Sequence, residues 1–113
     1  MKPGDIVLIR FPRTDLQKGK LRPALVVAVA PGQHPDLLLA LITSRIYQAV
    51  PDFDETITPS DQDFAASGLK AASVFRLARL ASVESGVVNA RLGRISSERL
   101  QQIRMRLVDW LKK

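Results

Sequence analysis

Cysteine is absent from this 113-residue sequence, and histidine occurs only once, as His34. The lack of cysteine excludes a disulfide framework, a thiolate nucleophile, a zinc knuckle and an iron–sulfur cluster. With one imidazole, a metal site would have to be built from carboxylates alone. A Ser-His-Asp triad would depend on His34, which lies in the turn-like segment 31–36. We therefore expect neither a metal ion nor a cofactor.

Long apolar runs and glycine-rich loops are also missing. No stretch approaches the roughly 18 apolar residues of a membrane span, and residues 1–5 lack the apolar core of a signal peptide. The six glycines form neither a G-x-G-x-x-G nor a G-K-[ST] motif, so no nucleotide-binding loop is visible. The sequence thus predicts a soluble, cytoplasmic protein without a membrane partner.

What is present is the composition of one globular domain. Hydrophobic residues make up 46% of the chain and charged residues 25%, which are ordinary values for a protein with its own core. A chain of this length fits one domain and is too short for two, so we assign residues 1–113 to a single domain.

The charge of the chain is positive and unevenly spread. Seventeen Lys and Arg residues against eleven Asp and Glu residues give a net charge of +6. Five of the acids lie in residues 46–69, which hold no Lys or Arg, so the remaining 89 residues carry a net +11. Arginine outnumbers lysine by eleven to six, and its planar guanidinium is the better phosphate clamp. This balance favours a polyanionic partner, although a solvated basic surface has the same composition.

The pattern of apolar residues predicts a mainly β fold. Apolar and β-branched runs bounded by Gly and Pro predict strands, and the helical spacing of apolar residues from Leu100 to Leu111 predicts a helix over 97–112. We therefore expect a small, strongly bent antiparallel β-barrel or half-barrel closed by a C-terminal helix. The expected strands cover residues 6–11, 24–30, 37–43, 55–58, 73–77 and 90–95.

Two polar residues stand at the ends of neighbouring apolar strands. Arg22 precedes the run 24–30 and Thr43 closes the run 37–43, and a short connection makes these strands antiparallel neighbours, so the two residues would be adjacent. A guanidinium beside a hydroxyl can grip a phosphodiester and stabilise the added charge of its transition state. RNA would supply its own 2′-hydroxyl nucleophile. From the residues alone, the alternative stays open that Arg22 binds backbone carbonyls and Thr43 satisfies its own strand end.

Four segments, in this order and spacing, resemble the MazF/PemK toxins of type II toxin-antitoxin systems. They are 3–8 (PGDIVL), 22–27 (RPALVV), 42–44 (ITS) and 73–77 (SVFRL), and the likeness continues into the terminal helix. The resemblance implies a homodimeric SH3-like barrel that cleaves single-stranded RNA, often mRNA, at short sequences without a metal ion. The implied products carry a 2′,3′-cyclic phosphate and a 5′-hydroxyl, and the implied protein partner is a cognate antitoxin.

The resemblance also implies roles for single residues. Arg22 matches the catalytic arginine that stabilises the transition-state charge and assists proton transfer, and Thr43 matches the catalytic threonine or serine that positions the scissile phosphate. Arg76 matches a second arginine found in part of the family, a phosphate contact. Many members carry an acid and a glutamine just beyond this arginine, where the chain has Ala78 and Arg79. Further candidates for RNA binding are Lys18, Gly19, Lys20, Ser44 and Arg45.

Two hypotheses from other classes stay open. The gyrase-poisoning CcdB toxins share this barrel, so a non-catalytic toxin that binds a protein target such as DNA gyrase is one alternative. A basic nucleic-acid-binding barrel without a toxic role is the other. Trp110 fits ordinary core packing better than an interface. The terminal basic residues either bind nucleic acid or face solvent; they are Arg99, Arg104, Arg106, Lys112 and Lys113.

Overall fold

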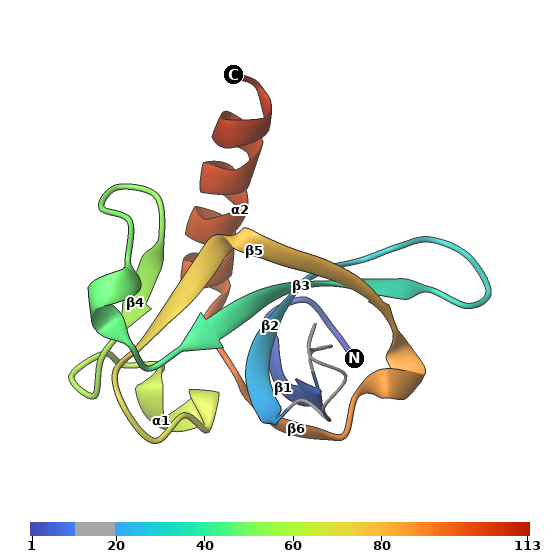
Figure 1. Cartoon of the computed structure of the whole chain (residues 1–113), viewed down its shortest axis with the longest axis horizontal. Coiled ribbons are helices and arrows are strands. Elements are labelled where there is room, and N and C mark those ends of the chain that lie inside the picture. The colour runs from blue at the N-terminus through green and yellow to red at the C-terminus, as the bar shows by residue number, and fades with distance from the viewer. Residues whose placement is uncertain (11–19) are drawn as a thin grey trace.

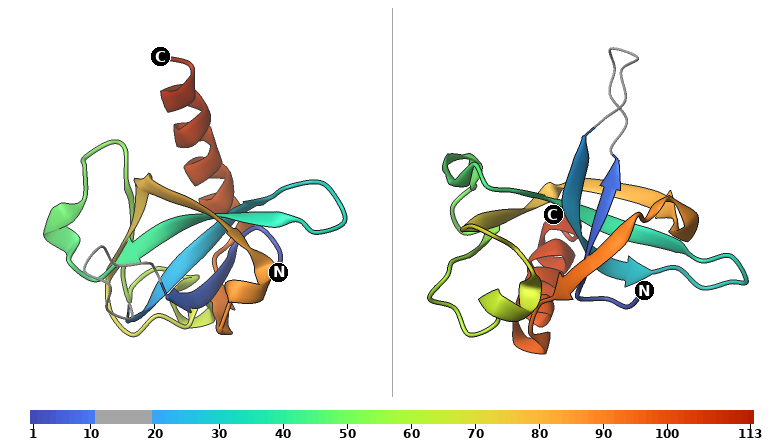
Figure 2. Two further views of the ribbon diagram at one scale, coloured as in Figure 1. Left: turned by 45° about the vertical axis from the view of Figure 1, so that its right-hand side comes forward. Right: turned by 90° about the horizontal axis from the view of Figure 1, so that it is seen from below.

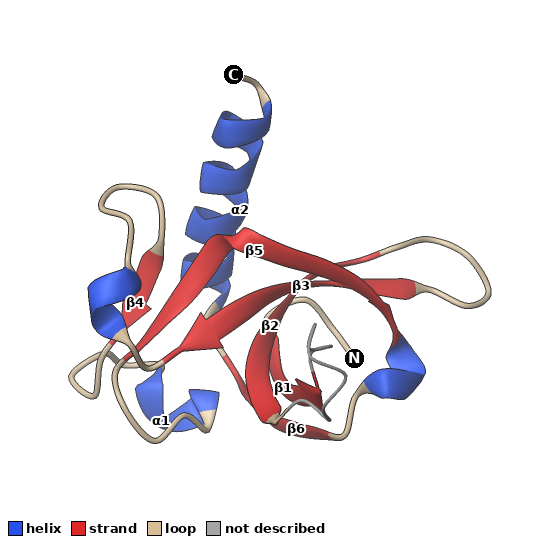
Figure 3. Ribbon diagram, in the orientation of Figure 1, coloured by secondary structure: helices blue, strands red, loops and turns tan. Residues whose placement is uncertain are grey.

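The computed structural model describes residues 1–10 and 20–113, and within them the chain forms a curled antiparallel β-sheet with a long C-terminal helix (Figures 1 and 3). The six strands of the sheet lie in the order β4-β5-β3-β2-β1-β6. Along the chain the elements are β1 (Asp5–Arg10), β2 (Leu21–Val29), β3 (Asp36–Thr43), η1 (Ile46–Gln48), β4 (Glu55–Ile57), α1 (Phe64–Ser67), β5 (Ser73–Glu84), η2 (Ser85–Val87), β6 (Ala90–Arg94) and α2 (Ser97–Leu111).

The mainly β half-barrel with a C-terminal helix is confirmed, and most element bounds fall within three residues of those expected. Phe11, at the end of the first expected strand, lies outside the described residues. The exception is β5, which was expected to end at Leu77 and continues to Glu84. Leu41 pairs with Arg76 whereas the neighbouring Ala40 pairs with Leu80, so three residues of β5 bulge between these pairs. A bulge breaks the alternation of apolar and polar residues, so the sequence pattern did not predict the second half of the strand.

Irregularities of this kind bend the sheet around its own core. The register also shifts between β2 and β3 and between β1 and β6, and Figure 2 shows the strands wrapping as a half-barrel. Leu25 and Val27 of β2 belong to the core cluster that α2 covers, whereas Ala24 and Val26 belong to a second cluster on the other face. The continuous apolar run in β2 is therefore explained, because this strand is buried on both faces.

Helix α2 packs on the sheet through one apolar side. Ser96 caps its N-terminus by accepting a hydrogen bond from the Arg99 backbone N–H at 3.2 Å, and Ile103 and Leu107 are buried. Trp110 was expected in the core, but it is 41% exposed and contacts the edge of Phe53 with the ring centroids 5.3 Å apart. The reason is geometric, because the last turns of α2 extend beyond the sheet (Figure 1).

Helix α1, which the sequence pattern did not predict, packs closely on β6 through two glycines. Gly68 ends the helix with a φ of 75°, a conformation that L side chains rarely adopt. A Cβ at Gly68 would lie 2.3 Å from the Leu92 carbonyl oxygen, and one at Gly93 would lie 2.1 Å from the Ala66 carbonyl oxygen. This close approach fixes the segment after α1 against β6, where the two form part of the groove described next.

Candidate active site

An open groove of about 610 Å³ lies where the start of β2 meets the end of β3. The segment that follows α1 forms another part of its wall, through Gly68, Leu69 and Lys70. We call this hollow the Arg22 groove. The residues that line it are Leu8, Lys20, Leu21, Arg22, Pro23, Ile42, Thr43, Ser44, Arg45, Gly68, Leu69, Lys70, Ala71, Ser73 and Leu92.

Strand pairing brings Arg22 and Thr43 into the same groove. Ala24 pairs with Leu41 across the antiparallel β2 and β3, and Arg22 and Thr43 each lie two residues further along their own strands in the direction of the groove. On its other side β2 pairs with β1, where Arg22 lies opposite Ile9. The antiparallel arrangement of β2 and β3 inferred from their short connection is therefore confirmed, and both residues line one hollow.

The two side chains are free to bind a ligand in complementary ways. The Thr43 Oγ1 accepts a hydrogen bond from the Arg45 backbone N–H at 3.1 Å. A hydroxyl that already accepts keeps its own proton available to donate. The Arg22 side chain is exposed and has no hydrogen bond or ion pair to any residue in 1–10 or 20–113. An unpaired guanidinium and a hydroxyl donor that line the same groove suit the binding of a phosphate group.

The other expected binding residues divide between the groove and places outside it. Ser44, Arg45 and Lys20 line the groove, and all three are exposed. Lys18 and Gly19 lie outside the residues that the structure describes. Lys70 also lines the groove, and sequence reasoning missed it because the residue ends the acidic stretch that was set aside as a polar loop. The cations that line the groove are therefore Lys20, Arg22, Arg45 and Lys70.

Arg76 is not among the residues that line the groove. Its Nη1 donates to the Gln48 Oε1 at 2.8 Å, its Nε lies 3.3 Å from the Asp54 Oδ2, and its side chain is only 17% exposed. Asp54 also accepts the backbone N–H of Leu77, in the bulge of β5, at 2.9 Å. The Asp54 carboxylate thus satisfies a bulge N–H that would otherwise be buried without a partner. A phosphate contact by Arg76 stays a prediction.

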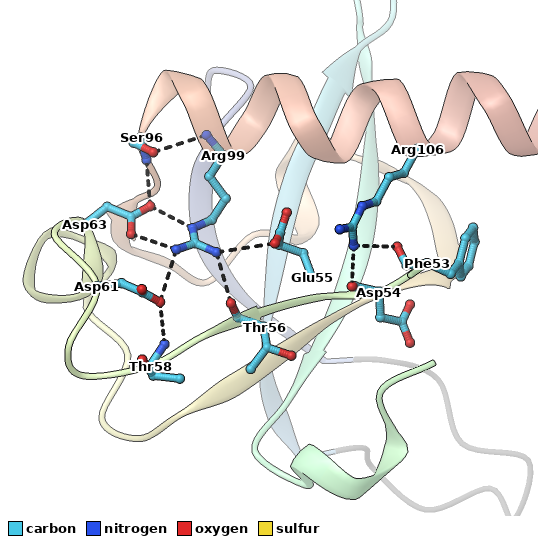
Figure 4. Close-up of polar contacts among 10 residues, drawn as sticks. All are labelled: Phe53, Asp54, Glu55, Thr56, Thr58, Asp61, Asp63, Ser96, Arg99 and Arg106. Carbon is cyan, nitrogen blue, oxygen red and sulfur yellow. Dashed lines mark hydrogen bonds and ion pairs between the residues drawn. The ribbon is translucent and has the colours of Figure 1, made fainter. Parts of the chain in front are cut away.

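Arg99 on α2 is surrounded by carboxylates from the acidic stretch (Figure 4). Its guanidinium binds Asp63 through two hydrogen bonds of 2.9 and 3.1 Å. Asp61 lies 3.2 Å away and Glu55 3.8 Å away, and the side chain of Arg99 is 13% exposed. The Thr56 carbonyl oxygen accepts a further hydrogen bond at 3.0 Å. We call this group the Arg99 cluster; it joins α2 to β4 and to the segment before α1.

The titration of the Arg99 cluster reflects this pairing. Burial alone would raise the pKa of Asp63, but the hydrogen bonds from Arg99 and from the Ser96 backbone N–H, with the charge of Arg99, outweigh it and lower this pKa below its ordinary value. Burial alone would lower the pKa of Arg99, but the same carboxylates raise it. Both groups are therefore held in their charged forms, and the cluster stabilises the fold most when Asp63 is ionised.

Two other arginines of α2 bind backbone carbonyls. Arg104 donates twice to the Val27 carbonyl oxygen, at 3.0 and 2.8 Å. Arg106 donates to the carbonyl oxygens of Phe53 and Asp54 (Figure 4). The sequence left open whether these arginines bind nucleic acid or face solvent. In the structure they bind backbone carbonyls instead. They attach α2 to the sheet and to the loop before β4.

Asp5, in the segment PGDIVL, is likewise structural. It is 4% exposed, accepts the Lys2 backbone N–H at 2.8 Å and pairs with Arg91 of β6 at 3.1 Å. Burial would raise the pKa of Asp5, but the backbone hydrogen bond and the charges of Arg91 and Arg94 lower it. This residue ties the N-terminus to the edge strand β6.

Within the described ranges, no group of three or more His, Cys, Asp or Glu side chains is arranged to hold a metal ion. None of the described helices is both long enough and apolar enough to cross a membrane.

The family to which the chain belongs follows from comparison with known proteins. The sequence model of the PemK-like, MazF-like toxin of type II toxin-antitoxin systems matches residues 2–111 of the chain. Comparison with curated proteins gives no match. The match spans both the Arg22 groove and the Arg99 cluster, and the curled sheet with its C-terminal helix is consistent with this family's fold. The chain belongs to the PemK-like, MazF-like toxin family of type II toxin-antitoxin systems.

Proposed function

We propose that this toxin is a metal-independent, sequence-specific endoribonuclease that cleaves single-stranded RNA, with mRNA as the natural substrate. The products are an RNA end with a 2′,3′-cyclic phosphate and an RNA end with a 5′-hydroxyl. Arg22 and Thr43 carry the reaction, and Lys20, Ser44 and Arg45 bind the substrate. Lys18, Gly19 and Arg76 complete the set of RNA contacts implied by the resemblance.

The observation that supports this proposal most is that the unpaired Arg22 side chain and the Thr43 hydroxyl line the same groove. The 2′-oxygen attacks phosphorus and loses its proton, the bond from phosphorus to the 5′-oxygen breaks, and that oxygen gains a proton. The phosphorane formed on the way carries an added negative charge, which the unpaired guanidinium of Arg22 stabilises. Thr43, whose oxygen already accepts from Arg45, directs its proton to a non-bridging phosphate oxygen.

The test is cleavage of a long single-stranded RNA in the presence of EDTA, with the ends of the products mapped. The wild-type protein makes discrete cuts that leave 2′,3′-cyclic phosphates. The variants Arg22→Ala and Thr43→Val lose these cuts, because each removes one group that stabilises the transition state. Arg79→Ala is the matched control, since Arg79 is an exposed arginine that does not line the groove. Folded wild-type protein that cuts no RNA, or Arg22→Ala protein with full activity, contradicts the proposal.

Membership of a type II toxin family implies a cognate antitoxin. We propose that an acidic, disordered segment of this antitoxin folds into the Arg22 groove, where it competes with RNA for the groove cations. We place the encounter in the cytoplasm. Titration with a peptide of that kind should inhibit cleavage by raising the RNA concentration needed for half-maximal rate, without lowering the maximal rate.

We also propose that the toxin is a homodimer, as the family resemblance implies. Leu111 is 74% exposed and Val108 49% exposed, so the end of α2 carries apolar surface that a second copy can cover. Light scattering on the eluting protein should give twice the chain mass of 12.5 kDa. A mass of one chain at micromolar concentration contradicts the dimer.

The same exposed end of α2 favours a second candidate function, a non-catalytic toxin that binds a protein target such as DNA gyrase. Trp110 and Leu111 present apolar side chains there, and aromatic residues are enriched in protein interfaces. Gyrase–DNA adducts in cells whose RNA stays intact would support this function against the endoribonuclease.

A further inference from the structure

Residues 46–50, which we call the rim segment, follow directly after the groove residue Arg45 and carry three exposed apolar side chains. Tyr47 is 78% exposed, Ile46 54% and Val50 47%. Tyr47 is the only tyrosine of the chain, and no large hydrophobic side chain in the described ranges is more exposed. One exposed apolar side chain is ordinary, but three within five residues beside a cationic groove indicate a contact surface.

Buried groups hold the rim segment in place. The Gln48 side chain accepts the hydrogen bond from Arg76 at 2.8 Å, and the Val50 backbone N–H donates to the Asp54 Oδ2 at 2.9 Å. The side chain of Asp54 is only 1% exposed, and its other oxygen binds Leu77 of β5. A segment fixed in this way presents its side chains with little further loss of conformational entropy on binding.

The rim segment is continuous with the candidate active site. The Arg45 backbone N–H binds the Thr43 hydroxyl, and Arg45 itself lines the groove. Tyr47 follows two residues later, in η1, the short helix that comes after β3. Two residues span at most about 7 Å of chain, so the ring lies within reach of a nucleotide that flanks a phosphate held in the groove.

We propose that Tyr47 stacks on an unpaired base that flanks the scissile phosphate and thereby helps to select the cleavage sequence. This inference rests on the proposed endoribonuclease function. A single-stranded RNA combines negative phosphates, which suit the cations of the groove, with flat apolar bases, which suit an exposed phenol ring. The four cations that line the groove and the three exposed apolar side chains of the adjoining rim segment match this combination.

The experiment measures binding separately from cleavage. The probe is a fluorescently labelled single-stranded RNA that contains the mapped cleavage sequence and carries 2′-O-methyl groups, so that it cannot be cut. Wild-type protein is compared with Tyr47→Ala, Tyr47→Phe and the control Met105→Ala, which truncates an exposed apolar side chain of α2. We expect about tenfold weaker binding for Tyr47→Ala, because stacking on an aromatic ring is lost, and near wild-type binding for Tyr47→Phe and Met105→Ala.

A set of probes with an abasic site at each position in turn locates the stacked base. At that position wild-type protein loses about tenfold in affinity, whereas Tyr47→Ala loses nothing further. Cuts made by Tyr47→Ala protein in a long RNA should lose their preference at the same position.

Three outcomes would overturn the inference in distinguishable ways. Wild-type affinity in Tyr47→Ala, with cleavage intact, removes the stacking role and leaves the endoribonuclease standing. Absence of both binding and cleavage by folded wild-type protein removes the proposed function and the inference together. A change in oligomeric mass in Tyr47→Ala, with RNA affinity unaltered, assigns the rim segment to a protein interface.

Discussion

The arginines of the Arg22 groove and those of helix α2 have the same charge but opposite surroundings. In the described part of the chain, the side chains of Arg22 and Arg45 are exposed and have no hydrogen bond or ion pair. Arg99 binds three carboxylates and a carbonyl, and Arg106 binds two carbonyls (Figure 4). An arginine whose donors are already occupied stabilises the fold and has little left to offer a ligand, whereas an unpaired one can bind an anion.

The net charge of the chain therefore does not show how many cations are available to bind a polyanion. A net charge of +6 counts both kinds of arginine alike. Three acids of the stretch 46–69, namely Glu55, Asp61 and Asp63, surround the guanidinium of Arg99, so the positive charge of Arg99 is already paired within the fold. Four exposed cations, Lys20, Arg22, Arg45 and Lys70, line the groove where the proposed chemistry takes place.

The largest expected effect is on catalysis by Arg22→Ala. Loss of one group that stabilises transition-state charge should lower the single-turnover rate of RNA cleavage by about 100-fold to 1000-fold. Because the side chain has no partner in the described ranges, the free energy of unfolding should change by less than about 0.5 kcal/mol. Rapid-quench cleavage assays and urea denaturation measure the two quantities. A variant that loses stability instead would assign Arg22 a structural role.

The second effect is the converse one, on stability in Arg99→Ala. Removal of this guanidinium leaves Asp63 and Glu55 largely buried without their cation, which should cost about 3 kcal/mol of unfolding free energy. Cleavage per folded molecule should stay within about twofold of wild type, since no residue of the cluster lines the groove. Arg99→Lys is the matched control, and it should recover part of the stability because it keeps the charge but not the two-bond geometry.

A smaller effect concerns the pH dependence of stability. The pKa of Asp63 is lower in the folded protein than its ordinary value of 3.8, so its stabilising contribution is complete above about pH 5 and is lost as the pH falls through the lowered value. Urea denaturation from about pH 6 to pH 3 should therefore show a steeper loss of stability in wild-type protein than in Asp63→Asn. If stability falls equally with pH in both proteins, the pKa of Asp63 is not lower in the folded state than in the unfolded state.

The smallest expected effect is on the salt dependence of RNA affinity, which distinguishes the groove cations from the cations of α2. For a non-cleavable single-stranded RNA, Lys70→Ala should reduce the slope of log affinity against log salt by about 0.7, the contribution of one phosphate contact. Arg104→Ala should leave this slope unchanged, since Arg104 is engaged with the Val27 carbonyl. Equal slopes in Lys70→Ala and wild type would remove Lys70 from the RNA site.

The sequence predicted much of the fold because local patterns carry it. β2 and β3 are nearly continuous apolar runs, and α2 has one apolar side. Residues 55–58 were expected as an edge strand, and β4 (Glu55–Ile57) lies at one edge of the sheet. The meeting of Arg22 and Thr43 in one groove also followed, since antiparallel pairing over a short connection leaves little freedom.

What the sequence did not disclose depends on contacts between distant residues. Arg99 and Asp63 are 36 positions apart, and no local pattern indicates that they will meet. The β5 bulge next to Arg76 depends on the buried Asp54 from another segment, so the second half of that strand was missed. Trp110 is spaced along the helix so as to share a face with the core residues. The end of α2 extends beyond the sheet, however, and Trp110 is partly exposed.

The different roles of the groove arginines and the α2 arginines are tested most directly by two measurements on the same two variants, Arg22→Ala and Arg99→Ala. The first quantity is the single-turnover rate of RNA cleavage in EDTA by the folded protein, and the second is the free energy of unfolding in urea. We predict that Arg22→Ala loses about 100-fold or more in rate and keeps its stability, whereas Arg99→Ala loses about 3 kcal/mol of stability and keeps its rate. Rapid cleavage by Arg22→Ala protein, or an equal loss of rate in both variants, would contradict this prediction.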